Sequence, residues 1–186
     1  MTEDKIVRSF VAIDFAEELQ QNWVQTAQLL ASMGFSGSWT HLGNFHLTLA
    51  FLGELPSEVV QSLWKELRKV LSSEPFELHV LDQVSYFRKG DIPRVLWVGT
   101  RPSPPLEALF SQAGPVLKRF SVRFHPQFSG HVTLGRIKRC PEQFQLLLQK
   151  VRTLPGTQHV QQVHLYQSTL SSKGALYRRL DSISLA

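Results

Sequence analysis

The sequence predicts one domain of alternating strands and helices, built as two lobes that are related by a pseudo-twofold axis. Short apolar runs with strand character alternate with stretches of helical periodicity along the chain. Their order repeats with an offset of 85 residues, which is the spacing between His46 and His131. Hydrophobic residues make up 42% of the 186 residues, so the chain can bury a sizeable core. The repeated order favours an internal duplication, and the hydrophobic content favours a folded domain.

The first half of the chain contains three predicted strands and two predicted helices. The strands lie over residues 8–14, 46–52 and 76–87, and the helices over residues 17–33 and 56–71. The strands are short apolar or alternating runs, whereas the helices have apolar residues at helical spacing. Gly34 and Gly37 interrupt the first helical pattern, Gly53 ends the second strand, and Pro56 opens the second helix.

The second half repeats this order and adds a closing strand. The strands lie over residues 94–100, 131–137, 160–170 and 175–184, and the helices over residues 104–120 and 141–151. We therefore expect a single domain over residues 1–186 with two repeat units, at about residues 8–87 and 93–172.

A His-x-Thr-Leu motif occurs at equivalent places in the two units. HLTLAFLGELP covers residues 46–56, and HVTLGRIKRCP covers residues 131–141. His46, Thr48, Leu49 and Pro56 fall on His131, Thr133, Leu134 and Pro141. A shared fold explains the repeated leucines, but it does not require a repeated histidine on a polar face. The repeat therefore indicates a functional site.

The residue types of the motif suit chemistry at phosphorus. Strand alternation places His46 and Thr48 on one face, and His131 and Thr133 on one face of the second strand. If the lobes pack about a twofold axis, these polar faces meet across one cleft. Two imidazoles can act there as a complementary acid and base, and two hydroxyls can donate to phosphate oxygens. The pattern predicts displacement at phosphorus without a metal ion or another cofactor.

Other kinds of site fit the sequence less well. An isolated His-x-Thr pair would usually be a surface feature. Cys140 is the single cysteine and no HExxH motif occurs, so we expect no metal site. The chain also lacks the Gly-x-Ser-x-Gly, Walker and GxGxxG motifs, which argues against a serine triad and against use of a nucleoside triphosphate.

The charge of the chain suits an anionic partner. The formal net charge is +5 and the isoelectric point is about 9.6. The first residues lack the apolar core of a secretory signal, and no apolar run approaches the about 20 residues of a membrane span. We therefore expect a cytoplasmic monomer with no membrane contact.

The chain resembles the two-histidine phosphoesterase superfamily, and within it the bacterial and archaeal RNA 2′,3′-cyclic phosphodiesterases, also called 2′-5′ RNA ligases. The resemblance rests on RSFVAID, NFHLTLAFLGE, PRVLWVG, HVTLGR and LYQSTL, which occur in the family's order. It implies a bilobal α+β fold with antiparallel sheets beside a central cleft. It also implies an enzyme that hydrolyses an RNA 2′,3′-cyclic phosphate end, or a small cyclic nucleotide, to a 2′-phosphate.

The resemblance also implies a role for each member of the two motifs. His46 would be the proton donor to the leaving oxygen, and His131 would be the proton acceptor that activates water. Thr48 and Thr133 would hold the phosphate. The two motifs are so similar that their residues alone do not assign acid and base.

Arg136, three residues after Thr133, is a further candidate for binding the phosphate because of its charge. Strict alternation, however, places Arg136 on the strand face opposite to His131. It reaches the cleft only if the strand bends near Gly135.

Other polar residues at strand positions are expected outside the site. For Arg8 and Arg94, at the starts of equivalent strands, we expect solvated strand ends. His79 and His164 are equivalent under the repeat, and both are expected on an exposed face.

Two alternative functions remain open from the sequence. Attack of a 5′-hydroxyl in place of water would join two RNA ends through a 2′-5′ linkage without ATP. A non-catalytic RNA-binding module would use the basic charge and the aromatic residues, but it would need neither the two histidines nor their threonines.

Overall fold

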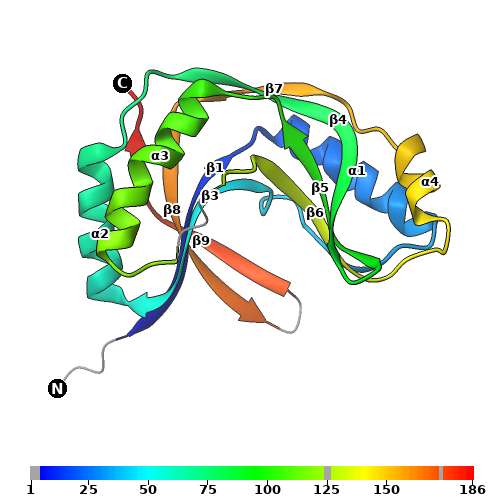
Figure 1. The fold of residues 1–186 in the computed structure, drawn as a ribbon, viewed down its shortest axis with the longest axis horizontal. Helices are drawn as coiled ribbons and strands as arrows, with labels where there is room; N and C mark the ends of the chain where they lie inside the picture. The colour runs from blue at the N-terminus through cyan, green and yellow to red at the C-terminus, as the bar shows by residue number, and fades with distance from the viewer. Residues whose placement is uncertain (1–4, 124–126, 172–173) are drawn as a thin grey trace.

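The computed structural model, which describes residues 5–123, 127–171 and 174–186, is a curved antiparallel sheet flanked by helices (Figure 1). The described strands are β1 Ile6–Asp14, β2 Ser36–Trp39, β3 His46–Pro56, β4 Phe76–Lys89, β5 Ile92–Thr100, β6 His131–Arg139, β7 Gly156–Val160, β8 Gln162–Ser171 and β9 Gly174–Ser184. The helices are α1 Glu17–Ser32, α2 Ser57–Val70, α3 Pro104–Arg119 and α4 Phe144–Lys150. The α+β class and the two-lobed antiparallel arrangement are as predicted.

The sheet runs in the order β7-β4-β5-β6-β3-β1-β8-β9, and β2 pairs with β6. We call β3, β1, β8 and β9 with α2 and α3 the first lobe, and β2, β4, β5, β6 and β7 with α1 and α4 the second lobe. The two lobes meet where Leu47 of β3 pairs with Val132 of β6. This pairing lies inside the two repeated motifs, so the junction between the lobes is also the place where the motifs meet.

Each lobe contains elements from both halves of the chain. In the first lobe, β1 pairs with β3 from the first half and with β8 from the second half. In the second lobe, β5 pairs with β6 from the second half and with β4 from the first half. Helices α1 and α3 are likewise exchanged, since α1 packs on β6 and α3 packs on β3. The lobes therefore follow the same pairing scheme, but neither lobe is one continuous half of the chain.

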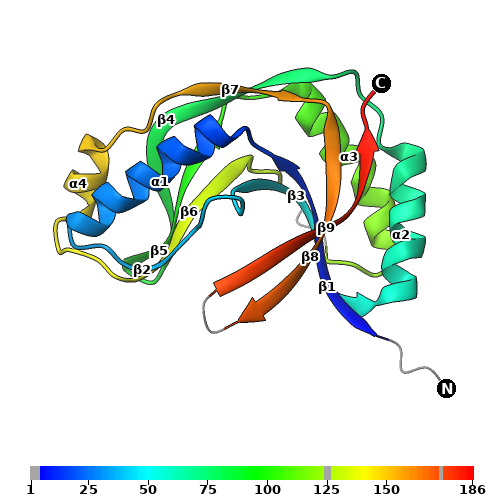
Figure 2. The same cartoon turned by 180° about the vertical axis from the view of Figure 1, so that it is seen from behind.

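Burial of one sheet face explains why these segments form strands and helices together. The apolar members of the two motifs, Leu47, Leu49, Val132 and Leu134, are all at most 2% exposed in one hydrophobic core. Burying a side chain of this size stabilises the fold by about 1.5–3 kcal/mol. Helix α2 contributes its apolar stripe to the same core, and Figures 1 and 2 show α2 and α3 on one flank and α1 and α4 on the other.

Several element boundaries differ from the predicted ones. Strand β3 continues past Gly53, because that glycine adopts φ +79° beside a bulge and lets pairing with β1 resume. Strand β2 was not predicted, since its four residues include Gly37 and are too short for a period to emerge. The predicted strand over residues 160–170 is two strands, β7 and β8, which are separated at Gln161.

The prediction that His164 is exposed is wrong. His164 lies on β8, between β1 and β9, and is 6% exposed. Its Nδ1 lies 2.8 Å from Ser182 Oγ, and its Nε2 lies 3.6 Å from Asp14 Oδ2. Alternation gives the face of a strand correctly, but side chains of the neighbouring strands cover this face. His79, in contrast, is exposed, and its Nδ1 lies 2.9 Å from Thr157 Oγ1.

None of the helices in the described ranges combines the length and the apolar character needed to cross a membrane.

Candidate active site

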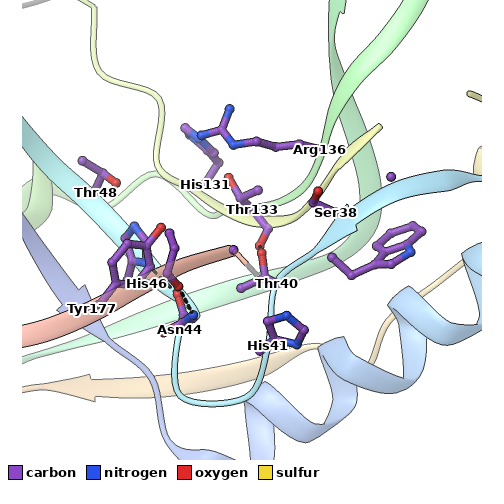
Figure 3. A pocket seen from close by; sticks show the side chains of 14 residues that line it. Ser38, Thr40, His41, Asn44, His46, Thr48, His131, Thr133, Arg136 and Tyr177 are labelled. Carbon is purple, nitrogen blue, oxygen red and sulfur yellow. Dashed lines mark hydrogen bonds between the residues drawn. The ribbon is translucent and has the colours of Figure 1, made fainter. Parts of the chain in front are cut away.

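One cavity of about 440 Å³ contains both repeated motifs (Figure 3). His46 and Thr48 reach it from β3, and His131 and Thr133 reach it from β6. The fifth predicted site residue, Arg136, also lines the cavity. All five residues singled out in the sequence therefore lie around one space at the junction of the two lobes.

The pairing of β3 with β6 brings the two polar faces together. Leu47 and Val132 are direct antiparallel partners, and each is the middle residue of its His-x-Thr sequence. Both middle side chains point into the core. Their polar neighbours must then point to the opposite, cleft-facing side of both strands.

Each motif contains a bulge at its leucine. On β3, Ala12 pairs with Thr48 and Val11 pairs with Ala50, so Leu49 is an extra residue. On β6, Trp97 pairs with Thr133 and Leu96 pairs with Gly135, so Leu134 is extra. A bulge bends its strand and changes the face on which later side chains lie. The two motif-bearing strands are therefore distorted at equivalent positions.

The bulge in β6 explains why Arg136 reaches the cavity. Without it, alternation would place Arg136 opposite to His131 and Thr133. Because Leu134 is the extra residue, Arg136 shares their face, and Figure 3 shows its guanidinium beside His131. The condition set by the sequence, a bend near Gly135, is met.

Both histidine rings are fixed by the same kind of hydrogen bond. His46 Nδ1 lies 2.8 Å from the carbonyl oxygen of Asn44, and His131 Nδ1 lies 2.8 Å from the carbonyl oxygen of Ser129. A carbonyl oxygen only accepts, so each Nδ1 carries the proton and donates it. The Nε2 atom of each ring is left to exchange a proton with a substrate.

Aromatic side chains surround the two imidazoles. The rings of Phe10 and Tyr177 lie 4.7 Å and 5.1 Å from His46, centre to centre. Phe87 and Trp97 lie 5.0 Å and 5.8 Å from the ring of His131. Burial by these neighbours lowers the pKa of both histidines below its ordinary value.

The charges near the two histidines differ. Burial is the largest influence on the pKa of His46 and lowers it. The hydrogen bond to the Asn44 carbonyl and the charge of Asp14 raise this pKa, whereas the charges of His131 and Arg136 lower it further. The pKa of His131 is raised by its bond to the Ser129 carbonyl and lowered by Arg136. A carboxylate therefore favours the protonated form of His46 and not that of His131.

Asp14 belongs to a polar network on the first lobe. Both of its carboxylate oxygens lie 2.6 Å from the Tyr166 hydroxyl, and Arg179 forms an ion pair with it. Burial and this carboxylate raise the pKa of Tyr166 to about 12. Tyr166 is therefore a hydrogen-bond donor to Asp14 at neutral pH, and the network holds the carboxylate in place.

Tyr177 is a cavity residue that the sequence interpretation missed. It comes from β9, which follows the second repeat unit and has no counterpart in the first. The comparison of the two repeat units, which identified the histidines, therefore could not identify Tyr177. The β8–β9 hairpin is attached beside the site by the side-chain amide of Asn44, which donates to the carbonyl oxygen of Ala175 over 3.0 Å.

Among the residues that the structure describes, no group of three or more His, Cys, Asp or Glu side chains is placed to hold a metal ion.

The sequence matches a known family twice. The family model described as LigT like Phosphoesterase matches residues 13–97 and again residues 98–177. The chain is 30% identical over 176 residues to an RNA 2′,3′-cyclic phosphodiesterase of Archaeoglobus fulgidus, covering 94% of this chain and 98% of that protein. It is 29% identical over 174 residues to an RNA 2′,3′-cyclic phosphodiesterase of Thermotoga maritima, covering 94% and 93%.

Solved structures show the same fold. The crystal structure of Escherichia coli LigT in complex with 3′-AMP superposes with a TM-score of 0.78 at 25% identity, covering 98% of this chain and 99% of that chain. The crystal structure of a Thermus thermophilus protein superposes with a TM-score of 0.72 at 24% identity, covering 96% and 97%.

Proposed function

The chain belongs to the LigT-like phosphoesterase family, and on that premise we propose that it hydrolyses RNA 2′,3′-cyclic phosphate ends to 2′-phosphates without a metal ion. The names of its relatives support the activity. The observation that carries the proposal is that His46 and His131 line one cavity, with Nδ1 of each ring bound to a backbone carbonyl. A general acid and a general base can then act on the same phosphorus.

The proposed reaction is an in-line displacement. His131 Nε2 takes a proton from water as the water oxygen bonds to phosphorus. The bond from phosphorus to O3′ breaks on the opposite side, and His46 Nε2 gives its proton to that oxygen. The phosphate remains on O2′, and the two histidines have exchanged protonation states, which solvent restores.

The surrounding charges support His46 as the acid. The acid must be protonated when substrate binds, and the Asp14 carboxylate favours protonated His46. The base must be neutral, and burial and Arg136 lower the pKa of His131. Arg136 lowers the pKa of His46 as well, so the difference between the two rings rests on Asp14. The environment thus supports the donor and acceptor roles, which the motifs leave open.

Thr48, Thr133 and Arg136 are proposed to hold the phosphate. The hydroxyls can each donate one hydrogen bond to a non-bridging oxygen, and the guanidinium can donate two. Negative charge increases on these oxygens as water attacks. Donors already oriented around the cavity stabilise that charge without reorganising.

The direct test is hydrolysis of an RNA oligonucleotide with a 2′,3′-cyclic phosphate end in the presence of EDTA. We expect conversion to a 2′-phosphate, read by gel mobility and by the phosphorus NMR shift of the product. His46→Ala and His131→Ala should each abolish most of the conversion. His79→Ala is the matched control, because His79 is exposed on β4 and does not line the cavity.

Three results would count against the proposal: no conversion by the unaltered protein, conversion that EDTA stops, or conversion that survives both histidine substitutions. A second RNA with a 5′-hydroxyl in the same reaction shows whether the ends are also joined. A product longer than either RNA would indicate ligation.

A further inference from the structure

We propose that Arg8 binds the phosphodiester group on the 5′ side of the terminal nucleotide, so that the site prefers oligoribonucleotide ends over nucleoside cyclic phosphates. The inference rests on the proposed function and extends it to the class of substrate. It assigns a role to a residue for which the sequence predicted only a solvated strand end.

The first lobe has an aromatic residue where the second lobe has its cation. Phe51 follows Thr48 at the same distance as Arg136 follows Thr133, and each comes after the bulged leucine of its motif. Phe51 is 46% exposed, so one side of its ring is open to solvent. The positive charge is supplied from β1, where the Arg8 guanidinium carbon lies 4.6 Å from the centre of the Phe51 ring.

Arg8 lies on the cleft side of the sheet. Phe10 and Phe51 are direct antiparallel partners, so their side chains share a face, and Phe10 contacts the ring of His46. Arg8 precedes Phe10 by two residues and therefore lies on the same face. Burial raises the pKa of the cavity residue Tyr177 above its ordinary value. The positive charges of Arg136 and Arg8 act in the opposite direction and reduce this increase. Tyr177 thus lies within the field of both arginines.

The guanidinium of Arg8 is only weakly engaged with the protein. Its one ion pair among the described residues is with Glu54, at 3.9 Å, and the two side chains are 37% and 66% exposed. Such a long, solvated pair contributes little. Within the same part of the chain, the buried Nε of Arg8 has no hydrogen-bond partner. Stacking on Phe51 holds the guanidinium plane in position while leaving its donors for an anion.

The direction of the proposed reaction places the substrate chain on this side. O3′ leaves toward His46, so the ribose must lie toward the first lobe, while the attacking water lies toward His131. The 5′ side of that ribose then continues over the face that carries Phe10, Tyr177 and Phe51. Arg179 is also on this face but forms an ion pair with Asp14. Arg8 is the cation that remains for the next phosphate of an RNA chain.

The test compares two substrates in the unaltered protein and in Arg8→Gln. One substrate is adenosine 2′,3′-cyclic phosphate, which has no second phosphate. The other is the dinucleotide ApA with a 2′,3′-cyclic phosphate end, which has one internucleotide phosphate. We expect Arg8→Gln to lower the ratio of kcat/KM for the dinucleotide to kcat/KM for the mononucleotide by about tenfold. Arg8→Lys should restore part of that ratio.

Arg178→Gln is the matched control. Arg178 lies on β9, where it donates to Gln167 Oε1 over 2.8 Å. Gln167 is the partner of both Arg178 and Ser9, so Arg178 lies on the face of the sheet opposite to Phe10 and Arg8. Its substitution should leave the ratio unchanged. The dependence of dinucleotide KM on salt should also fall in Arg8→Gln, by a slope of about 0.7, because one phosphate contact is lost. An unchanged ratio in Arg8→Gln, or an equal fall in Arg178→Gln, would overturn the assignment.

A binding experiment separates this inference from the proposed function. Adenosine 2′-monophosphate and ApA with a 2′-phosphate are titrated into both proteins by calorimetry. If Arg8 binds the internucleotide phosphate, Arg8→Gln weakens binding of the dinucleotide more than that of the mononucleotide, whether or not hydrolysis occurs. Equal weakening of both would refute the inference, while failure of hydrolysis alone would refute only the proposed reaction.

Discussion

Asp14 on β1 is the direct antiparallel partner of His46 on β3. The equivalent partner of His131 on β6 is Gly99 on β5, which has no side chain. Directly opposite residues in an antiparallel pair share a face, so a carboxylate flanks one imidazole, and Gly99 offers no counterpart beside the other. The repeat is thus interrupted beside His46, the proposed acid.

Asp14→Asn should therefore move the alkaline limb of the pH–rate profile to lower pH. Loss of the carboxylate removes an interaction that raises the pKa of His46, so the acid is protonated over a narrower range. The measurement is kcat/KM against pH, together with an NMR titration of His46. The acidic limb, set by His131, should move less. An unchanged His46 titration would show that Asp14 does not set the role of His46.

His46→Ala and His131→Ala should each lower kcat by about 10²–10⁴-fold. The double substitution should be little worse than either single one, because an acid and a base that act in one step are not additive. Single-turnover rates on a cyclic-phosphate oligonucleotide measure this. A double variant that loses the product of the two single effects would indicate that the histidines act in separate steps.

The sequence was sufficient to find these histidines because their signal is local and repeated. His46 and Thr48 share a face by simple alternation, and the same pattern recurs at His131 and Thr133. The bulges at Leu49 and Leu134 were not predictable, since a bulge is defined by the pairing with a neighbouring strand. Arg136 could therefore be placed only conditionally from the sequence.

The structural features that could not be predicted from the sequence depend on contacts between segments that are far apart in the chain. The exchange of β4 and β8 between the lobes follows from strand order, which local periodicity does not encode. His164 was wrongly expected to be exposed because Asp14 and Ser182, which contact it, come from two other strands. Tyr177 has no partner under the repeat, so only the folded chain shows that it reaches His46.

The optimum of kcat/KM should lie on the acidic side of neutrality. Burial lowers the pKa of both His46 and His131 from the ordinary value of 6.5, and kcat/KM reports on the free enzyme. As pH rises through the lowered pKa of His46, the acid loses its proton and kcat/KM falls. The alkaline limb of kcat should lie at higher pH, because a bound phosphate anion favours protonated His46. An alkaline limb of kcat/KM above about pH 7 would contradict this.

The free energy of unfolding should decrease when the pH falls from about 7.5 to about 5.5. The folded-state pKa values of His46, His131 and His164 are lowered, mainly by burial. The unfolded chain therefore binds more protons in this window, and protonation favours unfolding. Urea denaturation at both pH values measures the change. Combining His46→Gln with His131→Gln should reduce the difference between the two values; an undiminished difference would exclude these two residues as its source.

Gly37→Ala should destabilise the protein by about 2–4 kcal/mol and weaken substrate binding. A Cβ at Gly37 would lie 2.1 Å from the carbonyl oxygen of Arg136 and 2.9 Å from the Cα of Ile137. Both are backbone atoms of β6, so β2 must move away from β6 and loosen the segment that carries Arg136. Urea denaturation and KM for the dinucleotide measure the two effects. Ser36→Ala, an exposed position on β2, is the control and should change stability by less than about 0.5 kcal/mol. If Gly37→Ala were as stable as this control, the close approach of β2 to β6 would not be needed to hold Arg136 at the cavity.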